Sequence, residues 1–189
     1  MDAVALGRAD FADPERLATV LNGVDAIIHL AGVNRAVTDA AVEAGNVEIA
    51  QMLAAAIAGP GRPVHLVYGN SVQSTLDNHY GRGKARAAEV LSQAVMKTGG
   101  TFMNVLLPNL FGEHGRPNYN SFVATFCSEI AGGRKPQVID DKQVSLLHAQ
   151  RAAEVLIGAA MRRESGDFHP SGVQYLVSEV LESLSDTRY

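Results

Sequence analysis

The residues of this chain that could do chemistry gather around a tyrosine and a lysine four positions apart. Tyr80 and Lys84 open a helical pattern, and Ser71 stands nine residues before the tyrosine. At that spacing the phenol and the ammonium leave one face of a helix, about one turn apart. The cation would then lower the pKa of a phenol that otherwise titrates near ~10. Such a phenol can exchange a proton with a carbonyl or an alcohol while hydride moves to or from a nicotinamide.

The same three residues also have plain structural interpretations. Tyr80 could pack a helix against a sheet, Lys84 could be a solvated surface charge, and Ser71 could be a turn residue. A Tyr-x-x-x-Lys pattern alone occurs by chance in many chains. The predicted strand before Ser71 and the motifs on either side favour the chemical interpretation.

Composition indicates one domain with a real core. Of the 189 residues, 47% are apolar and 19% are charged. The formal net charge of −4 and the lack of a basic run give no reason to expect a nucleic-acid partner. No apolar stretch approaches the roughly 20 residues of a membrane-spanning helix, and the N-terminus lacks a signal-peptide pattern. We therefore expect no membrane partner and a cytoplasmic location.

Cysteine and histidine usage argues against disulfide and metal chemistry. Cys127 is the single cysteine, which excludes an internal disulfide and fits a reducing compartment. Its apolar neighbours Phe122 and Phe126 indicate a packed helical face, so we expect an inert core thiol. The six histidines show no paired spacing, and the sequence predicts no metal site.

Strand and helix patterns alternate along the chain. Asp13 is a candidate N-cap with Pro14 behind it, and Gly59 closes a long helical segment. Continuous apolar runs indicate strands buried on both faces. The predicted strands are Ala3–Gly7, Asp25–Leu30, Val64–Tyr68 and Thr101–Leu107, and the predicted helices are Pro14–Leu21, Ala40–Ala58 and Tyr80–Thr98. This alternation predicts an α/β fold with a doubly wound, parallel, Rossmann-like sheet.

Several short polar or glycine-containing segments fall where these strands end. In doubly wound folds ligands collect at the carboxyl ends of the strands. The segments are Gly7-Arg8, Leu30-Ala31-Gly32, Gly69-Asn70-Ser71 and Pro108-Asn109. Their shared position is the second reason to expect a ligand site here.

Three segments resemble the extended short-chain dehydrogenase/reductase (NAD-dependent epimerase/dehydratase) superfamily. They are His29 to Arg35, Ser71 to Lys84 and Pro108 to Cys127. Within the superfamily they are most similar to the capsular-polysaccharide reductases that make UDP-2-acetamido-2,6-dideoxy-L-talose, and the similarity runs to about Gly172. The resemblance implies reduction of a nucleotide-linked 4-keto sugar with NADPH, or alternatively with NADH. Full-length relatives also carry a C-terminal cupin domain, and we expect none within these 189 residues.

The resemblance implies roles for the three residues at the centre of the motif. Tyr80 would donate a proton, and Lys84 would hold the nicotinamide ribose and lower the pKa of the phenol. Ser71 would hydrogen-bond the sugar carbonyl. Protonation must accompany hydride delivery, because a bare alkoxide is a high-energy product.

Further cofactor and substrate contacts are implied in the same way. Arg8 would pair with a 2′-phosphate, Asp10 and Phe11 would contact adenine, and Leu30, Ala31, Gly32 and Pro108 would lie along the cofactor. Asn109 would meet the substrate diphosphate, with Arg116 and Asn118 as further substrate contacts. Each contact has a structural alternative. Arg8 could be an exposed arginine without a partner, and Phe11 could be a core residue. Leu30, Ala31 and Gly32 could simply pack at the end of a strand, and Asn109 could be an ordinary turn residue. We expect Asn46 to orient backbone rather than touch a ligand.

Two of the chain's departures from the family pattern bear on its fold. The Gly-rich loop after the first strand is absent, and Met1 begins at what resembles the second strand. The gap in the sheet predicts one of three arrangements: Ala3–Gly7 beside Ala26–Leu30, a poorly ordered N-terminus, or a partner chain in the slot. The second departure is Gly83, which inside a helix costs up to ~1 kcal/mol relative to alanine.

Two functions follow from these features. The first is a reductase of a nucleotide-linked keto sugar in surface-polysaccharide biosynthesis, weak or inactive in so short a chain. The second is a non-catalytic remnant that binds a sugar nucleotide or a partner chain. We expect a single truncated Rossmann-type domain over residues 1–189, with 112–189 as its smaller substrate-side region. The Ala-rich helices would suit a homodimer.

Overall fold

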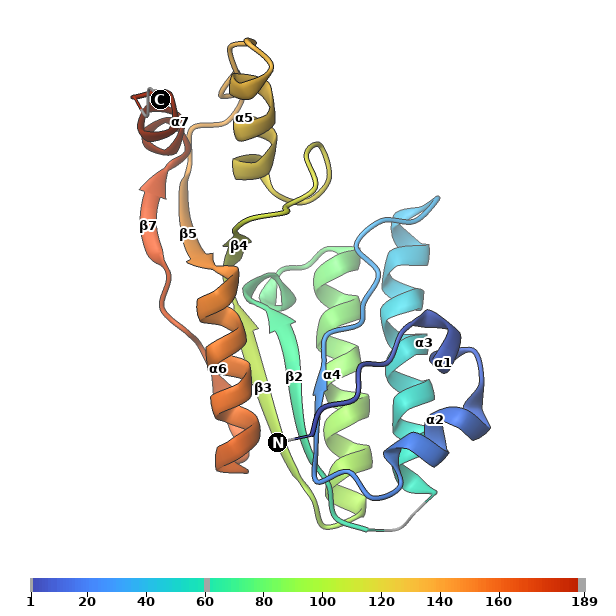
Figure 1. The fold of residues 1–189 in the computed structure, drawn as a ribbon. Helices are drawn as coiled ribbons and strands as arrows, with labels where there is room; N and C mark the ends of the chain where they lie inside the picture. The colour runs from blue at the N-terminus through green and yellow to red at the C-terminus, as the bar shows by residue number, and fades with distance from the viewer. Residues whose placement is uncertain (1, 60–61, 187–189) are drawn as a thin grey trace. The chain divides into compact units, whose positions relative to one another are not determined.

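A computed structural model describes residues 2–59 and 62–186 of the chain, which divides into two compact units (Figure 1). The first unit comprises Met1–Leu106 and Leu156–His169. The second comprises Leu107–Val155 and Pro170–Tyr189. The second unit covers much of the expected substrate-side region, but residues 156–169 return to the first unit.

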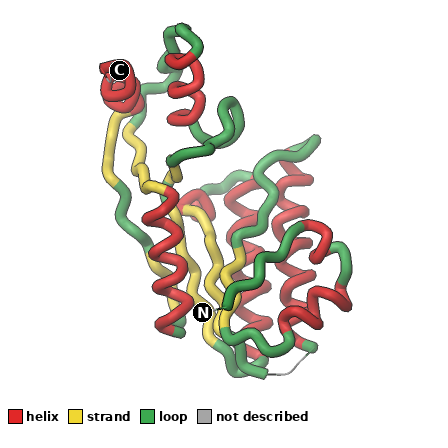
Figure 2. Tube along the Cα trace, in the orientation of Figure 1, coloured by secondary structure: helices red, strands yellow, loops and turns green. Residues whose placement is uncertain are grey.

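The first unit contains a sheet, whose strands are yellow in Figure 2. Its four strands lie in the order β1-β2-β3-β6. These strands are β1 (Ala26–His29), β2 (His65–Ser71), β3 (Thr101–Leu107) and β6 (Gly166–Phe168). β1 runs parallel to β2, with His29 opposite Tyr68, and β3 runs parallel to β6. The predicted parallel sheet is confirmed.

Polar caps define the helices that follow the strands. Asp13 accepts a hydrogen bond from the backbone N of Arg16 and opens α2 (Pro14–Leu21). Thr38 caps α3 (Asp39–Ala58) and Asn78 caps α4 (His79–Lys97) in the same way. Each of these three helices begins and ends within one residue of its predicted bounds.

Helices cover both faces of this sheet. Leu66 and Tyr68 of β2 belong to one hydrophobic cluster with residues of α2, α3 and α4. Side chains alternate between the faces of a strand, and His65 accordingly points the other way. Its Nε2 lies 3.0 Å from the carbonyl oxygen of Ala159 in α6 (Ala149–Arg162). The doubly wound, Rossmann-like arrangement is therefore confirmed.

The predicted strand Ala3–Gly7 is wrong, because this segment forms no ladder with the sheet. The backbone N of Gly7 donates to Asp10 Oδ2 at 2.8 Å, and Arg8 opens the short helix α1 (Arg8–Phe11). Among the described residues, β1 pairs with β2 alone. Ala3–Gly7 therefore does not fill the slot beside β1. The expected disorder of the N-terminus falls partly on Met1, outside the described residues, and a partner chain in the slot stays a prediction.

The expectation that β1 is buried on both faces is also wrong. Ile28 is 37% exposed, although it lies in the middle of the apolar run. An edge strand keeps a solvent-facing side where a central strand would be covered. The apolar sequence of this strand is typical of a central strand. Its burial is nevertheless set by its position at the edge of the sheet.

The second unit contains a three-stranded sheet with two helices. β4 (Asn109–Phe111) runs parallel to β5 (Gln143–His148), and β5 runs antiparallel to β7 (Val173–Leu176). Ser121 caps α5 (Phe122–Ala131), which contacts α7 (Val177–Asp186). No helix of the described part of the chain is both long and apolar enough to cross a membrane.

Cys127 is exposed, so the prediction of a buried core thiol is wrong. It lies on α5 and lines a pocket of about 700 Å³ within the second unit, together with Val123, His148 and Tyr175. The apolar side of α5 thus faces this pocket instead of a filled core.

Candidate active site

The end of β2 and the start of α4 bring Ser71, Tyr80 and Lys84 into one region of the first unit. Ser71 is the last residue of β2, and its Oγ accepts a hydrogen bond from the backbone N of Gln73 at 3.2 Å. This bond caps a short 3₁₀ helix (Val72–Thr75), after which Asn78 Oδ1 accepts from the backbone N of Gly81 at 2.8 Å. Tyr80 is the second residue of α4, and Lys84 follows about one turn later.

The Ser71 side chain lowers the pKa of the Tyr80 phenol by hydrogen bonding. The Tyr80 side chain is partly buried. Burial raises the pKa of its phenol, and the hydrogen bond from Ser71 offsets part of that rise. The phenol is therefore neutral near pH 7 and has a proton to donate.

Lys84 is buried, with only 4% of its surface exposed. Its Nζ donates to the carbonyl oxygen of Gly69 at 3.1 Å and lies 4.1 Å from the centroid of the Tyr68 ring. Burial lowers the pKa of the Lys84 ammonium to about 8. The expectation that this cation lowers the pKa of Tyr80 is wrong in direction, because burial dominates at Tyr80.

A stack of rings that the sequence did not suggest lies beside Lys84. The His29 and Tyr68 rings are stacked, with centroids 5.5 Å apart, and the Phe11 ring lies 6.1 Å from His29. Burial, followed by the charge of Lys84, lowers the pKa of His29 to about 4. The imidazole is therefore neutral near pH 7. The one available signal was that His29 and Tyr68 both stand near the ends of predicted neighbouring strands.

Asn46 of α3 fixes the segment that follows β1. Its Nδ2 donates to the carbonyl oxygens of Val33 at 2.7 Å and Val42 at 2.8 Å, and its Oδ1 accepts from the backbone N of Val33 at 3.2 Å. A Cβ added at Gly32 would come within 2.9 Å of Asn46 Oδ1. Asn46 thus orients backbone, as predicted, and only glycine fits at position 32 without a shift.

Glycines also let α3 and α4 approach each other. A Cβ at Gly83 would lie 2.9 Å from Glu43 Cα, a distance that real Cβ atoms essentially never show. A Cβ at Gly81 would lie 2.3 Å from the carbonyl oxygen of Leu76. The helix propensity that Gly83 loses is therefore offset by close helix packing, which the sequence alone did not reveal.

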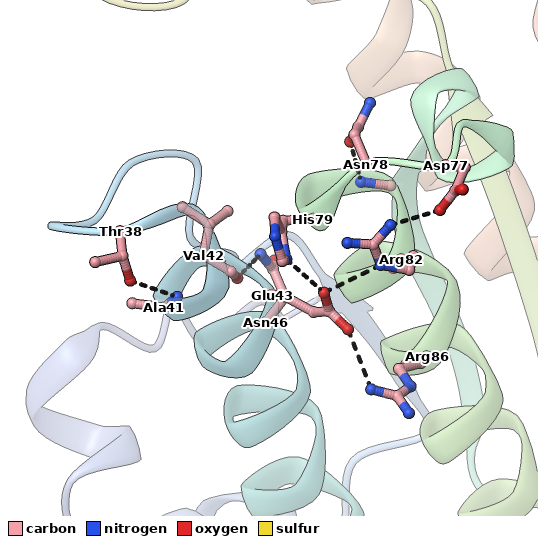
Figure 3. Close-up of polar contacts among 11 residues, drawn as sticks. Thr38, Ala41, Val42, Glu43, Asn46, Asp77, Asn78, His79, Arg82 and Arg86 are labelled. Carbon is pink, nitrogen blue, oxygen red and sulfur yellow. Dashed lines mark hydrogen bonds and ion pairs between the residues drawn. The ribbon is translucent and has the colours of Figure 1, made fainter.

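One carboxylate links α3 to the first turns of α4 (Figure 3). Glu43 lies 2.8 Å from His79 Nδ1, 3.2 Å from Arg82 Nε and 3.1 Å from Arg86 Nη1. The hydrogen bond from His79 is the main cause that lowers the pKa of Glu43. A pocket of about 350 Å³ adjoins this cluster and is lined by Asn34, Asp39, Val42, Asp77, Asn78, His79, Tyr80 and Arg82.

Comparison with known proteins identifies the family of this chain. Residues 2–169 match the NAD dependent epimerase/dehydratase family. The chain belongs to that family. It is 42% identical over 114 residues to a UDP-2-acetamido-2,6-beta-L-arabino-hexul-4-ose reductase of Pseudomonas aeruginosa, which covers 60% of this chain and 31% of that protein. The chain therefore spans about a third of the length of this curated relative.

Solved structures agree with this membership of the epimerase/dehydratase family. The capsular polysaccharide assembling protein CapF of Staphylococcus aureus is 27% identical and matches 92% of this chain and 47% of its own, with a TM-score of 0.72. A UDP-N-acetylglucosamine 4-epimerase of Bacillus cereus is 22% identical, with a TM-score of 0.80, and matches 92% of this chain and 65% of its own. The second likeness supports the fold alone.

The N-terminal candidates for contacts with the family's cofactor lie on or beside α1. Arg8 is exposed and opens α1 instead of ending a strand. Asp10 already accepts hydrogen bonds from the backbone N of Gly7 and from Arg16 Nε, and the first of these is the main cause that lowers its pKa. Phe11 packs against the hydrophobic cluster. The three cofactor roles stay predictions, with the core interpretation of Phe11 supported in part.

The remaining candidates fall in two places. Leu30 is 63% exposed beside Ala31 and Gly32 in the first unit. The others lie in the second unit, where Pro108 is buried and Asn109 Nδ2 donates to the carbonyl oxygen of Ser145 at 3.3 Å. Arg116 lies over the Tyr119 ring, and the backbone N of Asn118 donates to Thr125 Oγ1 at 2.9 Å. Their ligand contacts stay predictions.

The residues around Tyr80 suit the ribose and nicotinamide end of a dinucleotide. Lys84 offers ammonium protons, and Ser71 and Tyr80 offer hydroxyl groups. For the pyrophosphate, the sequence contains no Gly-rich loop. Within the described ranges, no three His, Cys, Asp or Glu side chains are grouped to hold a metal ion.

Proposed function

We propose that this chain is part of an NAD(P)-dependent reductase that acts on a nucleotide-linked 4-keto sugar in the cytoplasm, for surface-polysaccharide biosynthesis. The placement of Ser71 at the end of β2, next to the first turns of α4 with Tyr80 and the buried Lys84, is the observation that carries the proposal. The 42% identity to a nucleotide-sugar reductase supports the substrate class. NADPH is the proposed cofactor, with NADH as the alternative, and a homodimer is the proposed assembly.

Reduction of the ketone needs a proton at the carbonyl oxygen as the C–H bond forms. The bound nicotinamide would supply the hydride. Tyr80 would donate its phenol proton to the oxygen, and its raised pKa keeps that proton in place near pH 7. Ser71 would orient the carbonyl, and Lys84, largely protonated below pH 8, would hold the ribose.

A non-catalytic sugar-nucleotide or partner-chain binder is the second candidate. The side of β1 that pairs with no described strand favours it, because an unpaired strand edge can bind another chain.

Titration of NADPH, followed by its fluorescence, separates the two candidates. Binding at micromolar concentration supports the reductase, and no binding at millimolar concentration supports the remnant. Tyr80→Phe should retain cofactor binding and lose turnover of a 4-keto sugar nucleotide, because the phenol proton is gone. Unchanged turnover in this variant would end the catalytic assignment.

A further inference from the structure

A line of amide side chains crosses the sheet of the first unit and ends at Ser71. Asn70 on β2, Asn104 on β3 and Asp167 on β6 occupy three neighbouring strands. Asn70 Nδ2 donates to Asn104 Oδ1 at 2.9 Å, and Asn104 Nδ2 donates to Asp167 Oδ1 at 3.0 Å. At the other end, Asn70 Oδ1 accepts from the backbone N of Ser71 at 2.8 Å.

The hydrogen bonds of this line fix one orientation for each amide. Asn70 must present its oxygen to the N–H of Ser71, so its Nδ2 meets Asn104. Asn104 then presents its oxygen to Asn70 and its Nδ2 to the carboxylate of Asp167, which only accepts when ionised. Hydrogen bonds to a charged partner are stronger and polarise those that follow.

Burying the polar side chains of this line costs free energy, and packing of the sheet alone would not require polar residues there. Asn70 and Asn104 are both nearly inaccessible to solvent. Apolar side chains could fill the same space without requiring partners. The amides instead meet the backbone at the last residue of β2, immediately before the turn that leads to Tyr80.

Ser71 is consequently held at two points. Its backbone N is bound by Asn70, and its Oγ accepts from the backbone N of Gln73. The Ser71 hydroxyl in turn lowers the pKa of the Tyr80 phenol by hydrogen bonding. A shift of the backbone at this position would move the hydroxyl away from the phenol.

We propose that Asn70, Asn104 and Asp167 are positioning residues that hold the Ser71 hydroxyl toward Tyr80 by fixing the end of β2. The effect of these residues on turnover rests on the proposed function. Their effect on the position of the Ser71 hydroxyl does not. None of the three residues needs to touch substrate or cofactor.

The test is the ionisation of Tyr80 in the full chain labelled with 3-fluorotyrosine, followed by fluorine NMR against pH. The Tyr80 signal is the one missing from Tyr80→Phe. Ser71→Ala should raise the pKa of Tyr80, because a hydrogen bond that favours the phenolate is lost. Asn70→Ala should raise it in the same direction. An unmoved Tyr80 pKa in either variant overturns the proposal.

Asp167 provides a pair of variants with little risk to folding, because it lies exposed on the edge strand β6. Asp167→Asn keeps an oxygen for Asn104 Nδ2, so its Tyr80 pKa should stay closer to the wild-type value than that of Asp167→Ala. Asp167→Ala removes that acceptor and should shift Tyr80 in the same direction as Asn70→Ala. Equal behaviour of the two Asp167 variants would overturn the proposal.

Val105→Ala is the matched control on the same strand. Val105 is fully buried next to Asn104, so the variant loosens the core while leaving the amide line in place. It should lower the melting temperature and leave the Tyr80 titration unchanged. A shift as large as that of Asn70→Ala would mean general loosening and would overturn the proposal.

Turnover distinguishes failure of this inference from failure of the proposed function. Asn70→Ala should lower kcat about tenfold and change KM less than about threefold, because a misplaced hydroxyl affects the transition state more than binding. If the wild type shows no turnover and the titrations behave as expected, the proposed reductase fails and the positioning role stands. If turnover is present and Tyr80 does not respond, the positioning role fails.

Discussion

Burial sets the protonation states of the side chains around Tyr80. It raises the pKa of Tyr80 and lowers those of Lys84 and His29. The phenol and the imidazole are both neutral near pH 7, whereas the ammonium stays largely charged. This combination provides a proton donor and a cation within the same half-buried region.

His29 should make the fold sensitive to acid. Its pKa falls from 6.5 to about 4 on folding, so the unfolded chain binds the additional proton between these values. The contribution of His29 to the free energy of unfolding is therefore fully present above pH 6.5. It is lost as the pH falls toward 4, which lowers the free energy of unfolding by about 3 kcal/mol. Urea unfolding at several pH values measures the decline. His29→Phe, which keeps a ring in the stack, should show a decline smaller by that amount, and an equal decline would contradict the assignment.

Lys84 should make cofactor affinity depend on pH. The ammonium that would hold the ribose loses its proton as the pH rises through about 8. NADPH should therefore bind more weakly at pH 9 than at pH 7, by up to about tenfold. Fluorescence titrations at the two values test this, with Lys84→Met as the control that should bind weakly without this pH dependence. If NADPH affinity still falls between pH 7 and pH 9 in Lys84→Met, the group whose titration controls binding is not Lys84.

The sequence predicted the residues of this site whose relation is local. Ser71, Tyr80 and Lys84 follow from spacing around a turn and a helix, and the structure brings them together. The stack of His29 on Tyr68 and the line from Asn70 to Asp167 depend on the register of separate strands. No spacing along the chain encodes that register, so these partners could not be predicted.

Contact between α3 and α4 depends on residues that lack side chains. Gly83 meets the backbone of Glu43, and Gly45 meets Val33 in the segment after β1. Glu43 then bonds three basic side chains of α4. Close approach and a shared carboxylate together place the first turn of α4, which carries Tyr80.

Gly83→Ala should destabilise the protein although alanine favours helices. The added Cβ would lie 2.9 Å from Glu43 Cα, and backbone must move to admit it. We expect a loss of about 1–3 kcal/mol, as for overpacking in other cores. Thermal unfolding measures it. The matched control is Gly158→Ala in α6, where the nearest neighbour is the flexible end of Arg162 at 3.6 Å. That variant should be stabilised by about 0.4–1 kcal/mol, and a similar gain for Gly83→Ala would refute the packing argument.

Predictions of elements succeeded where caps and apolar runs agreed. Asp13 acts as the N-cap that the sequence predicted, and the long helices begin and end near their predicted bounds. Ala3–Gly7 failed because a strand needs a partner, and its end is instead bonded to Asp10. The prediction of a buried Cys127 was wrong because the apolar face of α5 lines a pocket. Local composition cannot distinguish such a face from one that packs in a core.

Among the residues that the structure describes, β1 is the edge strand of the first unit's sheet, next to the predicted gap. The chain spans 31% of its curated relative and 47–65% of the two solved relatives described above. An edge strand exposes backbone groups that can pair with another chain. The partner-binding interpretation predicts that another chain pairs with the open side of β1, so the pairing of this strand is worth measuring.

Hydrogen exchange of the β1 amides should reveal the state of this edge. The carbonyl oxygen of Asp25 accepts from the backbone N of His65. Because the direction of these groups alternates along a strand, the N–H of Ile27 should face β2 and that of Ile28 should face outward. In dilute protein we expect slow exchange at Ile27 and fast exchange at Ile28. Equal protection of both amides would contradict an open edge. Protection of Ile28 that grows with protein concentration would show that a second copy pairs there, and protection independent of concentration would place a segment of the same chain beside β1.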